Sequence, residues 1–123
     1  MFSNVILNNN SFTDVGGAVL KLYRGGTDES TFGPYLEIKH CVFDKVGNSK
    51  RNKYDASIST YGVQVNYIEN NIFKDSKPIK MYLVVGEPIV NIYNNNFFNT
   101  DKMVITGDEK YNEKNTTFMD PNF

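Results

Sequence analysis

The sequence predicts an all-β fold, a right-handed parallel β-helix of about four to five coils with two inserted loops. Two observations lead to this prediction: a motif recurs along the chain, and short apolar segments alternate with polar residues. No stretch shows the i, i+3, i+4, i+7 spacing of an amphipathic helix, so we expect essentially no helix. We expect a single domain over residues 1–123.

The recurring motif is a pair of polar residues, mostly asparagine, shortly before a phenylalanine. Its four clear copies end at Phe12, Phe43, Phe73 and Phe97, and a weaker fifth copy ends at Phe118. An apolar residue stands five positions before each phenylalanine, namely Leu7, Ile38, Ile68 and Ile92. Three positions before it stand Asn9, His40, Asn70 and Asn94, and two positions before it stand Asn10, Cys41, Asn71 and Asn95. The alternation predicts a strand in each copy, and Asn66 in an apolar position of the third copy predicts a one-residue bulge beside Val65.

A second alternating segment follows each phenylalanine. Its apolar positions are Ala18, Leu20 and Leu22 in the first copy, Ile79, Met81 and Leu83 in the third, and Met103 and Ile105 in the fourth. Ala56, Ile58 and Thr60 keep the same spacing in the second copy once the segment NSKRNKY is set aside as a loop. Each of these segments therefore predicts a further strand.

The spacing of the motif identifies the repeat. The phenylalanines are 31, 30, 24 and 21 residues apart, and the two longer intervals contain the loops GGTDESTFGP and NSKRNKY. Without these loops the unit has about 21 to 24 residues, a period typical of solenoids. Leucine-rich repeats have a similar period, but their leucine pattern is missing. In a parallel β-helix we expect the phenylalanines to stack inside, asparagines to occupy the bends, and Asn9, Asn70 and Asn94 to hydrogen-bond to one another through the core.

Composition and charge exclude several classes of function. The net charge of -1 and the pI near 5.8 argue against a nucleic-acid partner, since no basic face is available for phosphate. No apolar run approaches the roughly 20 residues that span a bilayer, and the first residues, MFSNVILNNNSF, lack the features of a signal peptide. Cys41 is the single cysteine, which excludes an internal disulfide and predicts a small buried residue.

The outward positions of the second strands provide candidate binding residues. Lys21 and Tyr23 lie beside the first strand, Lys80 and Tyr82 beside the third, and Arg24 follows Tyr23. A face that mixes cations with aromatic rings suits an acidic polysaccharide, because cations pair with carboxylates and rings stack on sugars. The alternative is that these are ordinary solvent-exposed strand residues. We interpret the charged segment NSKRNKYD as a solvated loop.

The segment RGGTDESTFGP invites a metal hypothesis. Asp28 and Glu29 supply the oxygen ligands that Ca²⁺ prefers, but neighbouring strand residues point in opposite directions and no regular acidic spacing supports a site. We therefore predict no metal site in this chain. As a structural loop, the segment would turn at Gly25 and Gly26, pair Arg24 with one of the two carboxylates, and end at Pro34.

The segment from Phe12 to Ser49, FTDVGGAVLKLYRGGTDESTFGPYLEIKHCVFDKVGNS, resembles the C-terminal β-helical part of the chondroitinase-B-like alginate lyases, polysaccharide lyase family 6. RGGTDESTFGP is its most specific element, and the resemblance extends over roughly Val5 to Ile105. It implies β-elimination on uronic-acid polysaccharides. In such enzymes Ca²⁺ neutralises the carboxylate, a lysine removes the C5 proton and an arginine assists the leaving oxygen. Arg24 ends a strand of the type GxxLxLxR and is the candidate for that arginine, whereas the partner lysine would lie one coil earlier.

Two function hypotheses follow. In the first, the chain is the C-terminal portion of a longer lyase for alginate or chondroitin and itself lacks the catalytic coils, because Met1 enters a coil without a polar cap. The resemblance then implies a secreted or periplasmic parent protein with Ca²⁺ in the full-length enzyme, and no cofactor in this chain. In the second, the chain is a non-enzymatic module that binds acidic glycans or mediates association through its Lys/Tyr face or an open end coil.

Overall fold

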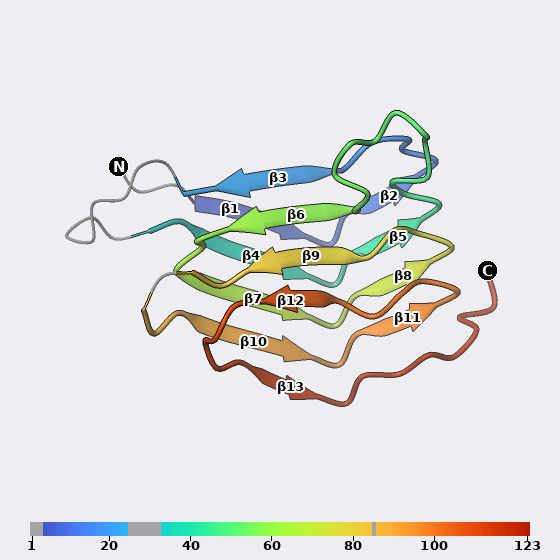
Figure 1. The fold of residues 1–123 in the computed structure, drawn as a ribbon. Coiled ribbons are helices and arrows are strands. Elements are labelled where there is room, and N and C mark those ends of the chain that lie inside the picture. Colours follow the sequence, from blue (N-terminus) through green and yellow to red (C-terminus); the bar gives the residue numbers. More distant parts are fainter. Residues whose placement is uncertain (1–3, 25–32, 85) are drawn as a thin grey trace.

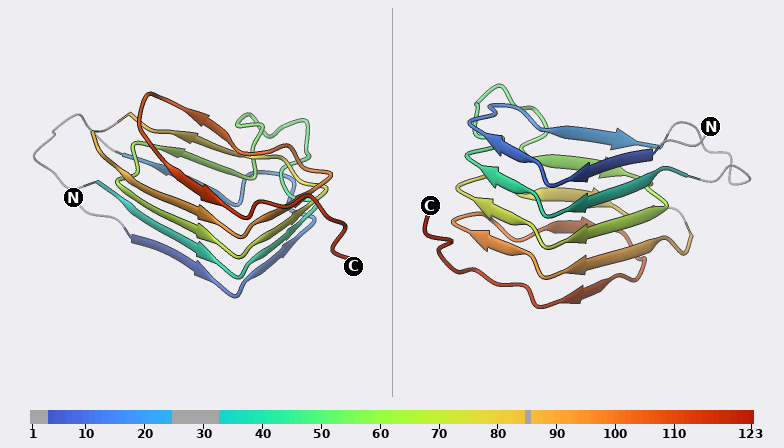
Figure 2. Two further views of the ribbon diagram at one scale, coloured as in Figure 1. Left: turned by 90° about the horizontal axis from the view of Figure 1, so that it is seen from below. Right: turned by 180° about the vertical axis from the view of Figure 1, so that it is seen from behind.

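The computed structural model describes residues 4–24, 33–84 and 86–123, and every regular element in these ranges is a β-strand. Three strands build each of four successive coils, and a thirteenth strand begins a fifth coil (Figure 1). The coils lie over one another along one axis when the molecule is viewed from below and from behind (Figure 2). The predicted parallel β-helix is thereby confirmed. None of the described residues forms a helix long and apolar enough to cross a membrane.

The strands form three parallel sheets, one for each side of the coil. Sheet A contains β1 (Asn4–Asn8), β4 (Tyr35–Lys39), β7 (Val65–Glu69), β10 (Ile89–Tyr93) and β13 (Asn112–Lys114). Sheet B contains β2 (Ser11–Thr13), β5 (Val42–Asp44), β8 (Ile72–Lys74) and β11 (Asn96–Phe98). Sheet C contains β3 (Leu20–Tyr23), β6 (Ile58–Tyr61), β9 (Ile79–Tyr82) and β12 (Val104–Thr106). Parallel pairing in register places each residue over its equivalent in the next coil, so side chains form columns.

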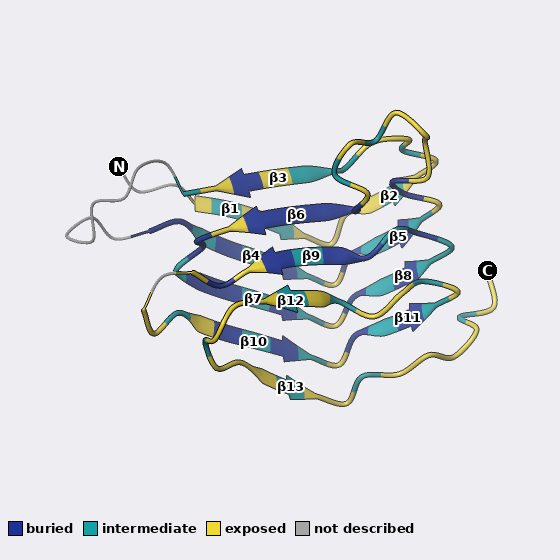
Figure 3. Cartoon of the chain, in the orientation of Figure 1, coloured by how far each residue is buried: buried dark blue, intermediate teal, exposed yellow. Residues whose placement is uncertain are grey.

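The core is a set of such columns inside the coils. The ring centroids of Phe12 and Phe43 are 5.1 Å apart, those of Phe43 and Phe73 are 4.4 Å apart, and those of Phe73 and Phe97 are 5.1 Å apart. This confirms the predicted stack of phenylalanines. The inward apolar side chains of the middle coils are buried, whereas Phe12 and most other apolar residues of the first coil are only partly buried. Figure 3 shows the same difference between the middle strands and the first ones. Within the described residues, the first coil packs against the second coil, which leaves most of its apolar side chains partly exposed.

The bend from sheet A to sheet B uses one left-handed residue in each coil. The φ angles of these residues lie between 54° and 60°, and the residues are Asn9, His40, Asn70, Asn94 and Asn115. All five are exposed, so asparagine occupies the bends as predicted, but the prediction that Asn9, Asn70 and Asn94 bond through the core is wrong. The bend interrupts the alternation of the strand, so the next residue points inward instead. The buried polar column therefore consists of Cys41, Asn71 and Asn95.

Two details of register bear on the sequence-based prediction. Asn66 pairs with Leu36 and Val90 in a ladder that is continuous from Val65 to Glu69, so no bulge lies within this strand. At its start the amides of Gln64 and Val65 both donate to the Pro34 carbonyl, at 2.9 and 3.3 Å, which is the pattern of a bulge beside Val65. The Asn66 amide is accommodated in place because its Nδ2 donates to the carbonyl oxygen of Val63 at 3.0 Å. In sheet C, Ile79 pairs with Ile58, which pairs with Leu20 and not with Ala18. The first coil thus has two additional residues before its third strand.

The second predicted loop lies between β5 and β6 and closes on itself through Asn52. The Nδ2 of Asn52 donates to the carbonyl oxygens of Gly47 and Ala56, both at 2.9 Å. The Asp55 amide donates to the Asn52 carbonyl at 3.1 Å and so completes the turn. We call residues 48–55 the β5–β6 loop. Its fold depends on these backbone contacts more than on its charged side chains, which agrees with the interpretation of Lys50, Arg51 and Lys53 as solvated.

Candidate functional site

The outer face of sheet C carries the predicted binding residues in two rows. Alternate residues of a strand point outward, and the parallel register brings those of β3, β6 and β9 side by side. One row consists of Lys21, Ser59 and Lys80, and the other of Tyr23, Tyr61 and Tyr82. We call these six residues the Lys/Tyr face. The structure therefore brings together Lys21, Tyr23, Lys80 and Tyr82, as the sequence predicted.

The tyrosine row is a regular aromatic strip across three coils. The ring centroids of Tyr23 and Tyr61 are 5.8 Å apart, and those of Tyr61 and Tyr82 are 5.9 Å apart. The three tyrosines are each 41–42% exposed, so each ring packs on its neighbour and still reaches solvent. Sequence reasoning missed Tyr61, although the spacing of Ile58 and Thr60 already placed it in an outward position.

The lysine row holds its cations among aromatic rings and hydroxyl groups. The Nζ of Lys21 lies 4.7 Å from the ring centroid of Tyr23 and 5.2 Å from that of Tyr54. The Tyr23 hydroxyl and the Ser59 hydroxyl are 3.2 Å apart and share a hydrogen bond that links the two rows. Interaction with the Tyr54 hydroxyl raises the pKa of Lys21, so this ammonium group stays charged at neutral pH.

The β5–β6 loop contributes to the same face, which the sequence did not predict. Its last two residues lie against the lysine row: Tyr54 contacts Lys21 of the first coil, and Asp55 contacts Lys80 of the third. The Asp55 carboxylate also lies 3.0 Å from the Nζ of Lys77. Lys77 and then Lys80 hold the pKa of Asp55 below its usual value, so the carboxylate is ionised. Loop length and charge alone gave no signal for these contacts.

Arg24 lies at the end of this face and not within its rows. Its backbone amide donates to the Tyr61 carbonyl at 2.8 Å, and its Nη1 donates to Gln64 Oε1 at 3.4 Å. The guanidinium group lies directly over Gly33, where an added Cβ would be 2.6 Å from Nη1. A larger residue at this position would have to displace the flexible Arg24 side chain and would also lie 3.1 Å from Gln64 Cβ. The predicted partners of Arg24, Asp28 and Glu29, and the predicted turn at Gly25 and Gly26 lie outside the described residues.

The outer face of sheet A differs from the Lys/Tyr face, because its lysine lies close to glutamate side chains of opposite charge. Lys39 lies within 4 Å of both Glu37 and Glu69, at 3.8 and 3.9 Å. The Tyr35 hydroxyl donates to Glu37 Oε1 at 2.8 Å, and this hydrogen bond raises the pKa of Tyr35 to about 12. Tyr67 packs edge-on against Tyr35 at 5.9 Å. Carboxylates on the strands would repel a polyanion here, whereas none stands on the strands of the Lys/Tyr face.

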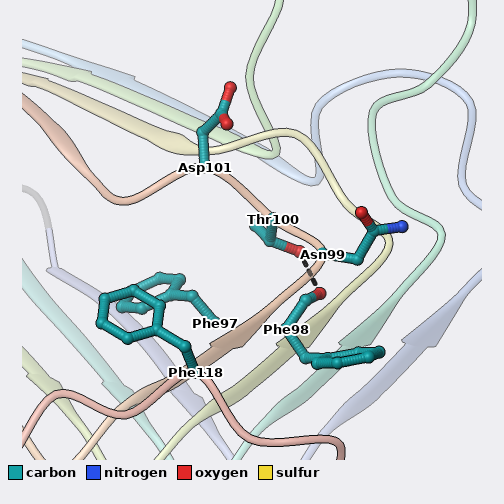
Figure 4. A pocket seen from close by; sticks show the side chains of 6 residues that line it. All are labelled: Phe97, Phe98, Asn99, Thr100, Asp101 and Phe118. Atoms are coloured by element: carbon teal, nitrogen blue, oxygen red, sulfur yellow. Dashed lines mark hydrogen bonds between the residues drawn. The ribbon is translucent and has the colours of Figure 1, made fainter.

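Two of the hollows on the described part of the surface are lined by residues other than the six of the Lys/Tyr face. The first, of about 530 Å³, is lined by Phe97, Phe98, Asn99, Thr100, Asp101 and Phe118 (Figure 4). The Thr100 hydroxyl already donates to the Phe98 carbonyl at 2.9 Å. The second hollow, of about 370 Å³, is polar, and its lining includes Lys77 as well as Asp75 and Asp101. It therefore contains one cation beside two carboxylates, whereas the lining of the first hollow contains no cation.

The resemblance implies Ca²⁺, but the described residues do not gather the side chains that a calcium site needs. Within residues 4–24, 33–84 and 86–123, no three His, Cys, Asp or Glu side chains gather closely enough to hold a metal ion. Calcium takes six to eight oxygen ligands, usually including several carboxylates. This part of the chain does not fit that donor set, and we derive no step through a metal ion.

The comparisons with known proteins agree with the fold. No family model matches the sequence, and no curated protein matches it. Among solved structures, the chain is similar to the PL6 family alginate lyase AlyGC, with 37% identity and a TM-score of 0.89 over 95% of this chain. A mutant of the same enzyme matches with 36% identity and a TM-score of 0.84 over 93% of this chain. In both cases the chain spans 17% of the length of the enzyme.

Proposed function

We propose a function from the premise that this chain belongs to polysaccharide lyase family 6. It is the β-helical portion with which a lyase of this family binds an acidic polysaccharide of the alginate or chondroitin type. The parent enzyme cleaves that polymer by β-elimination, and the catalytic coils lie outside this chain. The observation that carries the proposal is the Lys/Tyr face of sheet C.

The chemistry of the face matches a polymer of uronic acids. Such a polymer repeats a carboxylate along its length and presents the C–H faces of its sugar rings between them. Lys21 and Lys80 supply cations for the carboxylates, and charge-assisted hydrogen bonds are the strong ones. Tyr23, Tyr61 and Tyr82 supply exposed rings that can pack against sugar rings. Each row runs from one coil to the next, so neighbouring side chains of a row are about 4.8 Å apart, which is the distance between paired strands.

Binding contributes to β-elimination by positioning the polymer. Elimination needs a base at C5, a group that neutralises the adjacent carboxylate, and a proton donor for the leaving oxygen. The Lys/Tyr face holds the sugar chain in one orientation, so that the units beyond it enter the catalytic coils. Arg24 stands at the end of the face nearest the corner of the coil and is the residue we propose for contact with the reacting sugar. Any calcium ion belongs to coils outside the described residues.

Binding of defined alginate oligosaccharides, measured by isothermal titration calorimetry, tests the proposal. We expect Tyr61→Ala to weaken binding about fivefold, since an aromatic contact contributes about 0.5–1.5 kcal/mol. Lys21→Met should have a similar effect through the lost cation. Lys110→Met, which removes one exposed positive charge near the strand that begins the fifth coil, serves as the matched control. Wild-type protein without affinity for any uronic-acid oligosaccharide would rule out the proposed function.

A second measurement distinguishes a chain that only binds the polysaccharide from one that also cleaves it. The absorbance of the unsaturated uronate product reports elimination when the protein is mixed with alginate. Binding without product formation is the result we expect for this chain. Product formation that Arg24→Ala abolishes would instead place the catalytic centre in this chain.

A further inference from the structure

Lys80 of sheet C and Lys77, which lies just before β9, already hold a carboxylate, and it comes from the protein itself. The two oxygens of Asp55 are divided between two cations: Oδ1 lies 3.0 Å from Lys77 Nζ, and Oδ2 lies 3.5 Å from Lys80 Nζ. This is the arrangement in which two ammonium groups would hold the carboxylate of a sugar acid. The group that occupies it belongs to an inserted loop and not to the strands.

The position of this ion triad relates it to the binding face. Lys80 stands in the same row as Lys21, with Ser59 between them. The β5–β6 loop belongs to the second coil, yet its last two residues reach the lysines of both neighbouring coils. In the free protein this single loop therefore covers both ends of the lysine row.

The triad is accessible to a ligand. The side chain of Asp55 is 63% exposed, and those of Lys77 and Lys80 are 40% and 29% exposed. Ion pairs with this exposure are weak, because water competes for both partners. Another carboxylate can therefore displace that of Asp55 at little cost.

The loop does not need the Asp55 carboxylate to keep its shape. Asn52 closes the loop through the carbonyl oxygens of Gly47 and Ala56, and the Asp55 contact within the loop uses its backbone amide. The role of the Asp55 charge can thus be separated from the role of the loop.

We propose that Lys77 and Lys80 form a carboxylate-binding subsite for a uronic-acid polysaccharide, and that Asp55 occupies this subsite until the glycan replaces it. This inference rests on the proposed function and adds Lys77 to the face. It also gives the face a boundary. Lys77 also lines the polar hollow that contains Asp75 and Asp101, and these two carboxylates would repel a polyanion there.

The inference predicts opposite effects for the partners of one ion pair. Asp55→Asn keeps the size of the side chain and removes its charge, so binding of a uronic-acid oligosaccharide should become about two- to fivefold tighter at low salt. Lys77→Met should weaken the same binding by about the same factor. If Asp55 and Lys77 only fastened the loop, both substitutions would change affinity in the same direction.

Three further variants complete the experiment, which uses the same calorimetric titration. Asp120→Asn changes the net charge by the same amount as Asp55→Asn, but in the exposed C-terminal segment, and should leave affinity unchanged. Asp55→Asn combined with Lys77→Met and Lys80→Met should give no gain over the two lysine substitutions alone. Thermal unfolding of each variant shows whether the fold is retained.

The outcomes distinguish the two proposals. Wild-type binding with unchanged or weaker binding by Asp55→Asn overturns the subsite and leaves the proposed function standing. Absence of binding by both the wild type and Asp55→Asn overturns both. Tighter binding by Asp55→Asn that persists in the Lys77→Met, Lys80→Met background also overturns the subsite, because the gain would then not pass through these lysines.

Discussion

The side chain of Asn71 makes hydrogen bonds with both its amide hydrogens and its carbonyl oxygen inside the protein. Its Nδ2 donates to the Ile38 carbonyl at 2.9 Å and to Asn95 Oδ1 at 3.0 Å, and its Oδ1 accepts from the Cys41 amide at 2.9 Å. Asn95 repeats the pattern by donating to the Ile68 carbonyl at 2.9 Å. At each bend the asparagine thus replaces the backbone partners that the turning chain cannot provide.

Asn71→Ala should therefore destabilise the protein by about 2–4 kcal/mol, since each buried group left without a partner costs about 1–3 kcal/mol. Urea unfolding followed by circular dichroism measures this difference. Asn10→Ala is the matched control: Asn10 occupies the same column in the first coil, but it is exposed, and its Nδ2 donates to the Asn8 carbonyl at 3.3 Å. We expect less than about 0.5 kcal/mol for the control. Equal losses for the two variants would contradict a role for the buried column.

Cys41 occupies the same column with a different side chain. Its thiol lies 3.4 Å from the carbonyl oxygens of Leu7 and Lys39, and burial raises its pKa. The residue is 1% exposed, which agrees with its predicted role as a small buried residue. His40, which directly precedes Cys41, is exposed and has a left-handed backbone at the bend. The turn therefore explains the position of the single histidine of the sequence.

At the scale of elements, residues of the same type stack in columns from coil to coil and stabilise the sheets. Phe73 lies between two rings, nearly parallel to Phe43 with an interplanar angle of 3° and at 18° to Phe97. Phe12, by contrast, has a stacked neighbour on one side and is only partly buried. The contribution of a phenylalanine thus depends on its place along the stack.

Phe73→Ala should cost about 3–5 kcal/mol, the range for a large aromatic residue removed from a packed core. Phe12→Ala should cost less than about 2 kcal/mol, because less of its apolar surface is buried. The midpoints of urea unfolding give both values. A larger loss for Phe12→Ala than for Phe73→Ala would show that the first coil, and not the centre of the stack, limits stability.

At the scale of the whole molecule, the distribution of charge matters more than its sum. The net charge is -1, yet the Lys/Tyr face and the adjoining loop gather Lys21, Lys53, Lys77 and Lys80 near one side of the coil. The carboxylates Glu37 and Glu69 lie instead on the outer face of sheet A. The inference from the net charge that no basic face is available is therefore wrong, because a protein that is slightly acidic overall still gathers these lysines on one side.

Binding of a uronic-acid oligosaccharide should therefore weaken as salt is added. Between about 0.01 and 0.15 M ionic strength the screening length falls from about 30 Å to about 8 Å, and we expect the affinity to fall roughly fivefold or more. Calorimetric titrations at several NaCl concentrations give the slope. Tyr61→Ala should keep this slope, whereas Lys21→Met combined with Lys80→Met should reduce it. A wild-type affinity that does not change with salt would mean that the rings alone bind the glycan.

The sequence by itself determined the repeat, the stacked phenylalanines, the left-handed bends and four residues of the Lys/Tyr face, because each of these follows from spacing within one coil. Only the tertiary structure decided which asparagines point inward and that Asn66 lies in register with Leu36 and Val90. It also added Tyr54, Asp55 and Lys77 to the face. The physical reason is that a bend reverses the alternation of a strand and a loop of irregular length takes its path from neighbouring coils. Such contacts between coils are not encoded in the period of the repeat.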